Sequence, residues 1–247
     1  IFGEEDIYYN CGIRFTGSPY GRRNTGYRGY KVTFNADEKL HGVKWQARFD
    51  KGQNAGYRDR LAYHTLLAMG LPYCPTEWVE VRLNDRAEGI HEDILPPGKR
   101  FLDWFYRGDD DGQLFELAAF YRYTPDDDTD LSQFDRFHLS FTDLGDDKDE
   151  YRWWYRLRNH DRQDDYTTMI ATVKLIGSLP GGATKEEVGT LIDVHQWLRT
   201  MAVRSVNADW DFFGTGSSKN AYLYMPPSTG KWQVLHWDCE LSFNNAT

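Results

Sequence analysis

A single helix pattern stands among five short strand patterns in the first ninety-odd residues, and this order limits the fold more than any other feature. Alternating or aromatic-rich stretches predict strands at residues 8–16, 29–34, 43–49, 77–83 and 87–93. Good helix formers with spaced leucines predict a helix over residues 57–69, which Gly70 and Pro72 bring to an end. Strands, one helix and further strands together predict an α+β fold.

The remaining chain is predicted to be more helical. Residues 96–165 are rich in turn residues and acidic clusters, which predicts loops over a few short elements. Helices are expected over residues 166–179 and 185–206, the latter because apolar residues recur there at helical spacing. Strands at residues 221–225 and 231–235 are expected to form a hairpin, because a Pro-Pro-Ser-Thr-Gly turn separates them.

Composition argues against several classes of protein. Hydrophobic residues make up 40% and charged residues 27% of the 247 residues, which argues against a disordered, collagen-like or coiled-coil chain. The net charge of −9 argues against a nucleic-acid-binding surface, but 11 basic against 7 acidic residues in the first sixty allow a local anion site. No apolar run approaches the ~20 residues of a membrane-spanning helix. The chain starts without Met or a signal-peptide pattern, so we expect a piece of a longer protein.

Cysteine, histidine and acidic spacings give no strong metal motif. Cys11, Cys74 and Cys239 lack a C-x-x-C spacing, so one disulfide with a free thiol and three reduced cysteines both stay open. The seven histidines include no H-E-x-x-H pair, which argues against a zinc site. Residues 126–130 have the D-x-D-x-D spacing of a calcium loop, but Leu131 replaces the expected glycine. A solvated acidic loop is therefore the favoured interpretation.

The segment over residues 207–241 carries the strongest indication of chemistry. Asp211 follows the expected long helix, Asn220 lies nine residues further on, and Asp238 ends the expected hairpin. Phosphoryl transfer needs such a set, because one carboxylate orients the attacking hydroxyl while an amide oxygen and a second carboxylate hold Mg²⁺ on the nucleotide phosphates. Asp and Asn in loops also commonly cap helices and stabilise turns. The spacing alone leaves both interpretations open.

The same segment resembles the spore-coat protein H (CotH) kinase family, whose members look like distant protein kinases. The shared pattern is W-D, N-x-Y-L-Y, P-x-T-G-K-W and a hydrophobic strand ending in W-D. Earlier segments follow in the same order. Residues 12–19 resemble the family's G-x-R-x-x-G-S strand, residues 30–34 its S-F-R-I-K-F strand, and residues 57–63 its L-R-E-K-L-A-Y helix. Residues 99–102 and 111–115 resemble D-K-R-F-L and D-G-N-L-Y.

The resemblance implies a protein-kinase-like fold with two lobes. A β-rich nucleotide lobe is expected at residues 1–95, and a more helical lobe at residues 96–247, with its last helices beyond the end of this sequence. The resemblance also implies ATP-dependent phosphoryl transfer to Ser or Thr hydroxyls of a protein substrate, with Mg²⁺ or Mn²⁺. Family members occur in spore coats and as modules of secreted or surface proteins, so a similar location is expected. The oligomeric state is left open.

Site residues carry over from the family pattern one at a time. Asp211 matches the catalytic aspartate, Asn220 the first metal ligand, and Asp238 the metal-binding aspartate that corresponds to the carboxylate of the kinase DFG motif. Arg28 and Arg58 match basic residues that would neutralise the phosphates of ATP. The resemblance thus predicts one catalytic residue, two metal ligands and two phosphate-binding residues.

Trp237 and several departures from the family pattern bear on nucleotide recognition. Next to Asp238, Trp237 is expected either to stack on adenine or to lie in the core. Leu95 stands where the family has a glutamate between its lobes, which argues against standard adenine recognition. His236 and Glu240 replace a proline and an aspartate of I-P-W-D-L-D, although Glu240 keeps a carboxylate. The alternatives are a non-catalytic surface or coat module for adhesion or assembly and, more weakly supported, a carbohydrate-binding module.

Overall fold

The computed structural model describes most of the chain. The described residues are 6–17, 29–42, 44, 46–50, 57–117, 119–123, 134–137, 141–179, 181–214 and 219–243. Within these ranges the chain forms three antiparallel sheets and six helices, which confirms the predicted α+β class. None of the helices found there has both the length and the apolar composition to cross a bilayer.

The first sheet is built from the N-terminal part of the chain. Its strands are β1 (Gly12–Phe15), β2 (Tyr30–Thr33), β3 (Gln46–Asp50), β4 (Thr76–Leu83) and β5 (Arg86–Ile94). They are ordered β1-β2-β3-β5-β4, because α2 (Tyr57–Ala68) leads the chain away after β3 and back as the outer strand β4. Val32 and Ala47 lie directly opposite each other and pack with Tyr8 and Leu40. The apolar face of the sheet therefore has its own small core.

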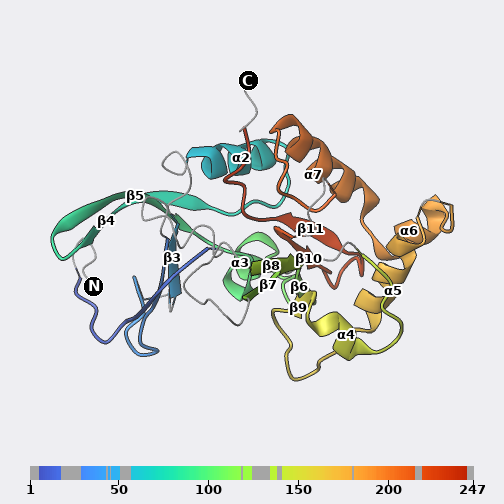
Figure 1. Cartoon of the computed structure of the whole chain (residues 1–247), viewed down its shortest axis with the longest axis horizontal. Helices are drawn as coiled ribbons and strands as arrows, with labels where there is room; N and C mark the ends of the chain where they lie inside the picture. Colours follow the sequence, from blue (N-terminus) through green and yellow to red (C-terminus); the bar gives the residue numbers. More distant parts are fainter. Residues whose placement is uncertain are drawn as a thin grey trace.

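The second sheet brings together segments that lie far apart in the sequence. Its order is β11-β10-β6-β9, and Figure 1 shows it near the middle of the molecule. The strands are β6 (Leu114–Leu117), β9 (Tyr155–Leu157), β10 (Ala221–Tyr224) and β11 (Gln233–His236). The predicted hairpin is confirmed as β10 and β11. Strand β6 comes from the turn-rich middle of the chain, and a separate pair is formed by β7 (Phe120–Tyr123) and β8 (Phe134–Phe137).

The prediction of one helix over residues 185–206 is wrong, because the structure has two helices there. α6 (Lys185–Leu191) ends at Ile192, whose backbone is extended (φ −123°, ψ 135°) and forms a bridge with Trp232. The Asp193 side chain then caps α7 (Val194–Val206) by accepting a hydrogen bond from the Gln196 N–H at 3.1 Å. Pairing with Trp232 thus overrides a helical spacing that continues through the break.

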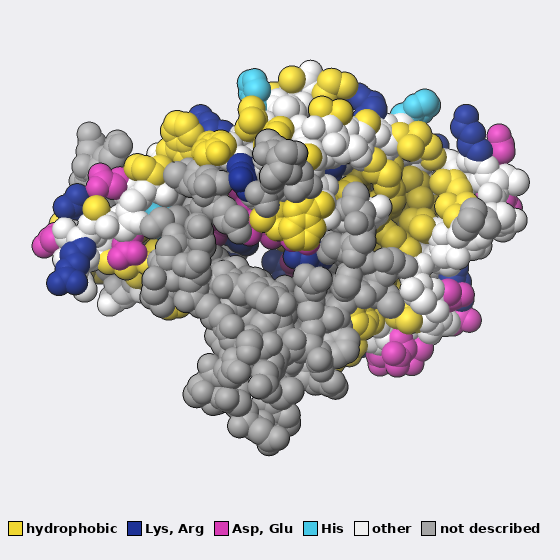
Figure 2. Space-filling view, turned by 45° about the horizontal axis from the view of Figure 1, so that its top comes forward, with side chains coloured by type: hydrophobic (Ala, Val, Ile, Leu, Met, Phe, Trp, Pro, Cys, Tyr) yellow, Lys and Arg dark blue, Asp and Glu magenta, His cyan; other side chains and the backbone are white. Residues whose placement is uncertain are grey.

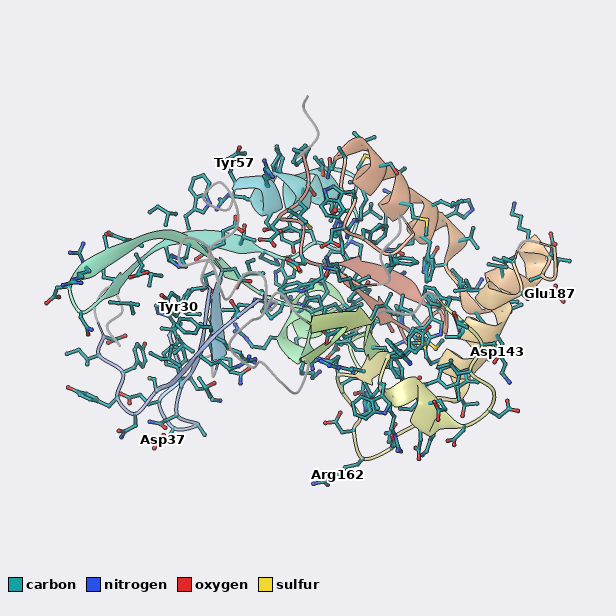
Figure 3. The ribbon with its side chains drawn as sticks, in the orientation of Figure 1. Tyr30, Asp37, Tyr57, Asp143, Arg162 and Glu187 are labelled. Carbon is teal, nitrogen blue, oxygen red and sulfur yellow. The ribbon has the colours of Figure 1, made fainter. Side chains whose placement is uncertain are left out.

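Three further helices complete the described chain, and the principal cores lie around the second sheet. These helices are α3 (Lys99–Phe105), α4 (Lys148–Arg152) and α5 (Thr167–Gly177). Figure 3 shows many side chains gathered around β10 and β11. The same view labels Tyr30 in β2 and Asp37 in the loop that follows β2. One core cluster joins Tyr63 and Leu66 of α2 to Tyr222 and Leu235 of the second sheet. The division at residues 95/96 and the two-lobed arrangement stay predictions.

The three cysteines are free thiols. Cys74 and Cys239 are buried, and Cys11 is half-buried. Of the two possibilities that the sequence left open, the structure therefore has three reduced cysteines and no disulfide among them.

Candidate functional site

The loop after α7 and the β10–β11 hairpin bring Asp211, Asn220 and Asp238 together. The Asn220 amide nitrogen donates to the backbone oxygen of Asp211 at 2.7 Å and to its carboxylate at 3.1 Å. Asn220 immediately precedes β10, and Asp238 follows β11 by two residues. The backbone N–H of Trp237 donates a hydrogen bond of 3.3 Å to the backbone oxygen of Asn220. This bond extends the pairing of the hairpin by one residue beyond β10 and β11.

Two of these residues have a backbone conformation that is uncommon outside glycine. Asn220 has φ 62° and Asp238 has φ 58°. The left-handed region costs energy for residues with a Cβ, although Asn and Asp tolerate it better than most. Such strain persists where the surrounding structure holds it, and it clusters at functional sites. In this protein the left-handed conformation occurs at Asn220 and Asp238, which lie at the same end of the β10–β11 pair.

Acidic side chains outnumber basic ones at this point. Burial raises the pKa of Asp238, and the nearby Asp50 and Asp211 raise it further against the opposing charges of Lys219 and Arg48. Burial and the charge of Asp238 likewise raise the pKa of Glu240 to about 8. A carboxylate resists ionisation among like charges in a buried place, so this group of side chains favours a cation.

The donor set suits Mg²⁺ or Mn²⁺. The Asn220 amide nitrogen is directed at Asp211. The side-chain oxygen of Asn220 accepts no hydrogen bond from the described residues, so it is available to a cation. Carboxylate and amide oxygens are the ligands that these hard cations prefer. Asp238 and Asn220 would hold the ion. Asp211 has a different partner, since Lys219 Nζ lies 2.7 Å from its carboxylate.

Arg48 is a component of the site that sequence reasoning missed. It lies on β3 of the first sheet, and its guanidinium stands 4.7 Å from the ring centroid of Trp237. It forms an ion pair with Asp50, which also accepts a hydrogen bond from the Thr16 hydroxyl at 2.6 Å. The only sequence signal for Arg48 was the basic excess of the first sixty residues, which does not single out a position.

Trp237 lies at the edge of the core. Its side chain is buried with the residues of α2 and β10, and it meets Tyr222 edge to face. Arg48 covers its ring. The sequence predicted that Trp237 either stacks on adenine or lies in the core. The structure supports the core position, and Arg48 occupies one face of the ring.

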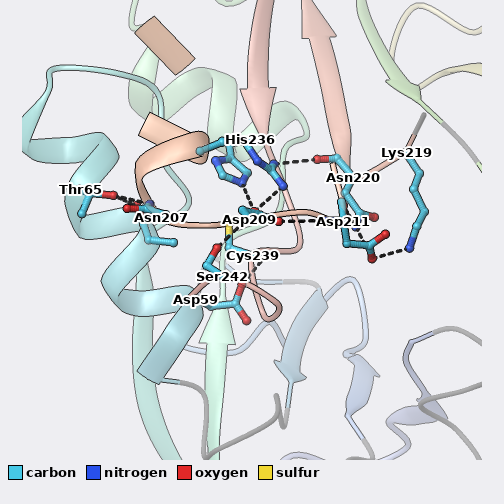
Figure 4. A network of polar contacts seen from close by, with 12 residues as sticks. Asp59, Thr65, Asn207, Asp209, Asp211, Lys219, Asn220, His236, Cys239 and Ser242 are labelled. Atoms are coloured by element: carbon cyan, nitrogen blue, oxygen red, sulfur yellow. Dashed lines mark hydrogen bonds and ion pairs between the residues drawn. The ribbon is translucent and has the colours of Figure 1, made fainter. Parts of the chain in front are cut away.

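A buried polar network beneath the site fixes the loop that carries Asp211 (Figure 4). At its centre, one Asp209 oxygen forms an ion pair with Arg204 and accepts hydrogen bonds from His236 Nε2 and the Ser242 hydroxyl, both at 3.2 Å. The other oxygen accepts a hydrogen bond from the Asp211 N–H at 3.3 Å. Burial opposes ionisation, but the His236 hydrogen bond and the Arg204 charge hold the pKa of Asp209 below its usual value. One carboxylate thus links α7, β11 and the loop that carries Asp211.

Asp209, His236 and Cys239 also place three potential metal-ligating atoms within 4.8 Å of one another. Burial and the positive charge of Arg204 lower the pKa of His236 to about 3, so this imidazole is neutral. The Arg204 guanidinium already neutralises Asp209. A metal ion would have to share the carboxylate with this buried cation, so we assign the cluster to the polar network.

Helix α2 forms hydrogen bonds with the segments that carry Asp238 and Asp211. The Asp59 carboxylate accepts a hydrogen bond of 2.6 Å from the Cys239 N–H, directly after Asp238. Burial raises the pKa of Asp59 well above its usual value, and Asp238 adds to this effect. The Asn207 amide donates to the Thr65 hydroxyl at 2.7 Å. The only sequence signal for Asp59 was its place in the helix motif at residues 57–63.

The other predicted positions lie in different surroundings. Arg28 and the acidic stretch at residues 126–130 lie outside the described residues. Arg58 is half-buried in the first turn of α2. Leu95 packs against the core, and the neighbouring Glu92 is buried, where desolvation raises its pKa to about 8 against the charge of Arg60. The predicted phosphate-binding role of Arg28 and Arg58 stays a prediction.

Comparison with known proteins identifies related sequences at the family level. The model of the family described as "CotH kinase protein" matches residues 46–247, well over half of the chain. A search of curated proteins gave no match. The matched residues include Arg48, Asp211, Asn220 and Asp238.

Proposed function

Since the chain belongs to the CotH kinase protein family, we propose that it is an ATP-dependent kinase that phosphorylates Ser or Thr hydroxyls of a protein substrate. The observation that carries this proposal is the meeting of Asp211, Asn220 and Asp238 at one end of the β10–β11 hairpin. The coat, surface or secreted location implied by the family resemblance belongs to the same proposal.

Each residue has a distinct role in the proposed reaction. Asp211 accepts the hydrogen bond of the acceptor hydroxyl and orients its oxygen towards the γ-phosphorus. Lys219, 2.7 Å from the Asp211 carboxylate, restrains that side chain and supplies positive charge beside the transferring group. Asp238 and Asn220 hold Mg²⁺ or Mn²⁺, which would neutralise phosphate charge when bound. Asp209 keeps the Asp211 backbone in place through its hydrogen bond to the N–H.

A non-catalytic coat or surface module with the same fold is the alternative. Two observations favour it: Leu95 packs in the core where the family has a glutamate, and Arg48 covers the ring of Trp237. Both remove features that would recognise adenine. Both leave Asp211, Asn220 and Asp238 together at the end of the hairpin, so we favour the kinase.

The test is transfer of labelled phosphate from ATP to a basic protein substrate and to the protein itself, with Mg²⁺ and then Mn²⁺. We expect Asp211→Asn and Asp238→Asn each to lower the rate at least about a hundredfold. Asp37→Asn removes an exposed carboxylate in the loop that follows β2 and serves as the control, with an unchanged rate. Absence of transfer by the natural chain, with nucleotide binding intact, would establish the non-catalytic module.

A further inference from the structure

Three basic residues form a row across the first sheet. Arg14 on β1 lies directly opposite Lys31 on β2, and Lys31 lies directly opposite Arg48 on β3. Residues opposite each other on neighbouring strands point to the same face of a sheet. With strands about 4.8 Å apart, the row spans roughly 10 Å from Arg14 to Arg48. We call these three residues the basic row.

The basic row faces the second sheet and the acidic site. Side chains alternate between faces, and the neighbouring Val32 and Ala47 point the other way into the small core of the first sheet. Arg48 reaches Trp237, and its charge influences Asp238. Figure 2 shows basic and acidic side chains together in a hollow near the middle of one face of the molecule. The basic row and the carboxylates therefore line one region between the two sheets.

A fourth cation approaches from the second sheet. The pKa of Lys31 is lowered first by burial and then by the charges of Arg14, Arg158 and Arg48. Arg158 directly follows β9, so its charge reaches the row from the opposite side. Like charges placed directly opposite one another destabilise a sheet. The fold therefore accumulates positive charge here at a cost in stability.

The row has too few acidic partners to balance this charge. Arg48 is paired with Asp50, and Arg158 lies 3.7 Å from Glu116. The side chains of Lys31 and Arg14 form no hydrogen bond or ion pair within the described part of the chain. Two adjacent cations whose side chains have no acidic partner among the described residues lie on the face directed towards the proposed phosphoryl-transfer site, and they point to an anionic ligand.

We propose that the basic row, with Arg158, binds the linear polyphosphate of the nucleotide, and that nucleotides are recognised by their phosphates with little selectivity for the base. This inference rests on the proposed function. Arg48 lies over the ring of Trp237, the residue before Asp238, so the phosphate nearest the carboxylates would meet Arg48, and the following phosphates would meet Lys31 and Arg14. A base needs an aromatic or apolar surface for stacking. Among the described residues, Arg48 covers the ring of Trp237, and this face of the first sheet carries cationic side chains in place of apolar ones.

The test compares ATP, GTP and inorganic tripolyphosphate as ligands by calorimetric titration at fixed Mg²⁺. We expect their dissociation constants to agree within about threefold, and tripolyphosphate to displace ATP. Lys31→Gln and Arg14→Gln should each weaken the binding of all three ligands by about tenfold or more, because each removes a charged hydrogen bond to the phosphates. Lys39→Gln makes the same charge change at an exposed lysine of the same part of the chain and should leave the affinities unchanged.

Stability without ligand provides a second measurement. Because Lys31 is repelled by its neighbours, Lys31→Gln should unfold at the same or a higher temperature than the natural chain when no ligand is present. The same variant should lose most of the stabilisation that tripolyphosphate gives to the natural chain. A loss of ligand binding through misfolding would instead lower the unfolding temperature of the free protein.

Three results would overturn the inference: ATP binding more than tenfold tighter than GTP and tripolyphosphate, full affinity in Lys31→Gln, or no binding of tripolyphosphate. These are separable from failure of the proposed function. Polyphosphate binding that depends on Lys31, in a chain without phosphoryl transfer, would retain this site and remove the kinase. Phosphoryl transfer at an unchanged rate in Lys31→Gln would retain the kinase and remove the proposed polyphosphate site.

Discussion

Removing one partner of the buried pair between Asp209 and Arg204 should destabilise the protein more than removing one partner of an exposed pair among the described residues. The two side chains are 0% and 1% exposed, so replacing Asp209 by Asn leaves the Arg204 charge buried without its counter-ion. Breaking a buried pair in this way typically costs about 3–5 kcal/mol. For a chain of this size each kcal/mol shifts the melting temperature by roughly 2–4 °C. We therefore expect Asp209→Asn to lower the melting temperature by about 6–20 °C.

The assay is thermal unfolding followed by tryptophan fluorescence, with two comparison variants. Asp146→Asn removes a carboxylate that is 93% exposed and paired with Lys174, so it should cost less than about 1 kcal/mol. In the Asp209→Asn background, Arg204→Met removes the stranded charge and should restore part of the lost stability. The reasoning is refuted if Asp209→Asn costs no more than Asp146→Asn, or if Arg204→Met restores nothing.

Two further predictions concern a buried acid and a helix cap. Burial raises the folded-state pKa of Glu92 to about 8, so the folded protein keeps a proton that the unfolded chain loses near pH 4.5. Stability should therefore fall by about 3–5 kcal/mol between pH 4.5 and 8, and Glu92→Gln should flatten this decline in unfolding curves; a decline of unchanged size would contradict it. Asp193→Ala should cost about 1–2 kcal/mol, because Asp193 caps α7 and also accepts a hydrogen bond from Gln233. An unchanged urea midpoint for Asp193→Ala would show that this cap does not stabilise the protein.

The sequence by itself determined the elements whose signals are local. Helix α2, with Gly70 beyond its end, and the β10–β11 hairpin are present close to their predicted bounds, because spacing and turn chemistry act over a few residues. The order of Asp211, Asn220 and Asp238 was visible for the same reason: two segments joined by a hairpin bring these residues together. The family-level identification rested on several short motifs that occur in the same order along the chain.

Only the tertiary structure decided how distant segments pair. The break between α6 and α7 at Ile192 follows from the bridge between Ile192 and Trp232. The spacing of apolar residues along the helix does not predict this bridge. Strand β6 joins the second sheet through β10, more than a hundred residues further along the chain. Arg48 reaches Trp237 in the same way, across nearly two hundred residues.

The charge arrangement of the site also required the fold. Asp209 and Asp211 are two residues apart, yet one is the centre of a buried network and the other faces Lys219. Arg14, Lys31 and Arg48 form a row only because β1, β2 and β3 pair in one register. Spacing along the chain reports which way a residue points within its own element, whereas burial and neighbouring charge depend on which elements meet. The sequence therefore determined which chemical groups were available, and the tertiary contacts decided which of them act together.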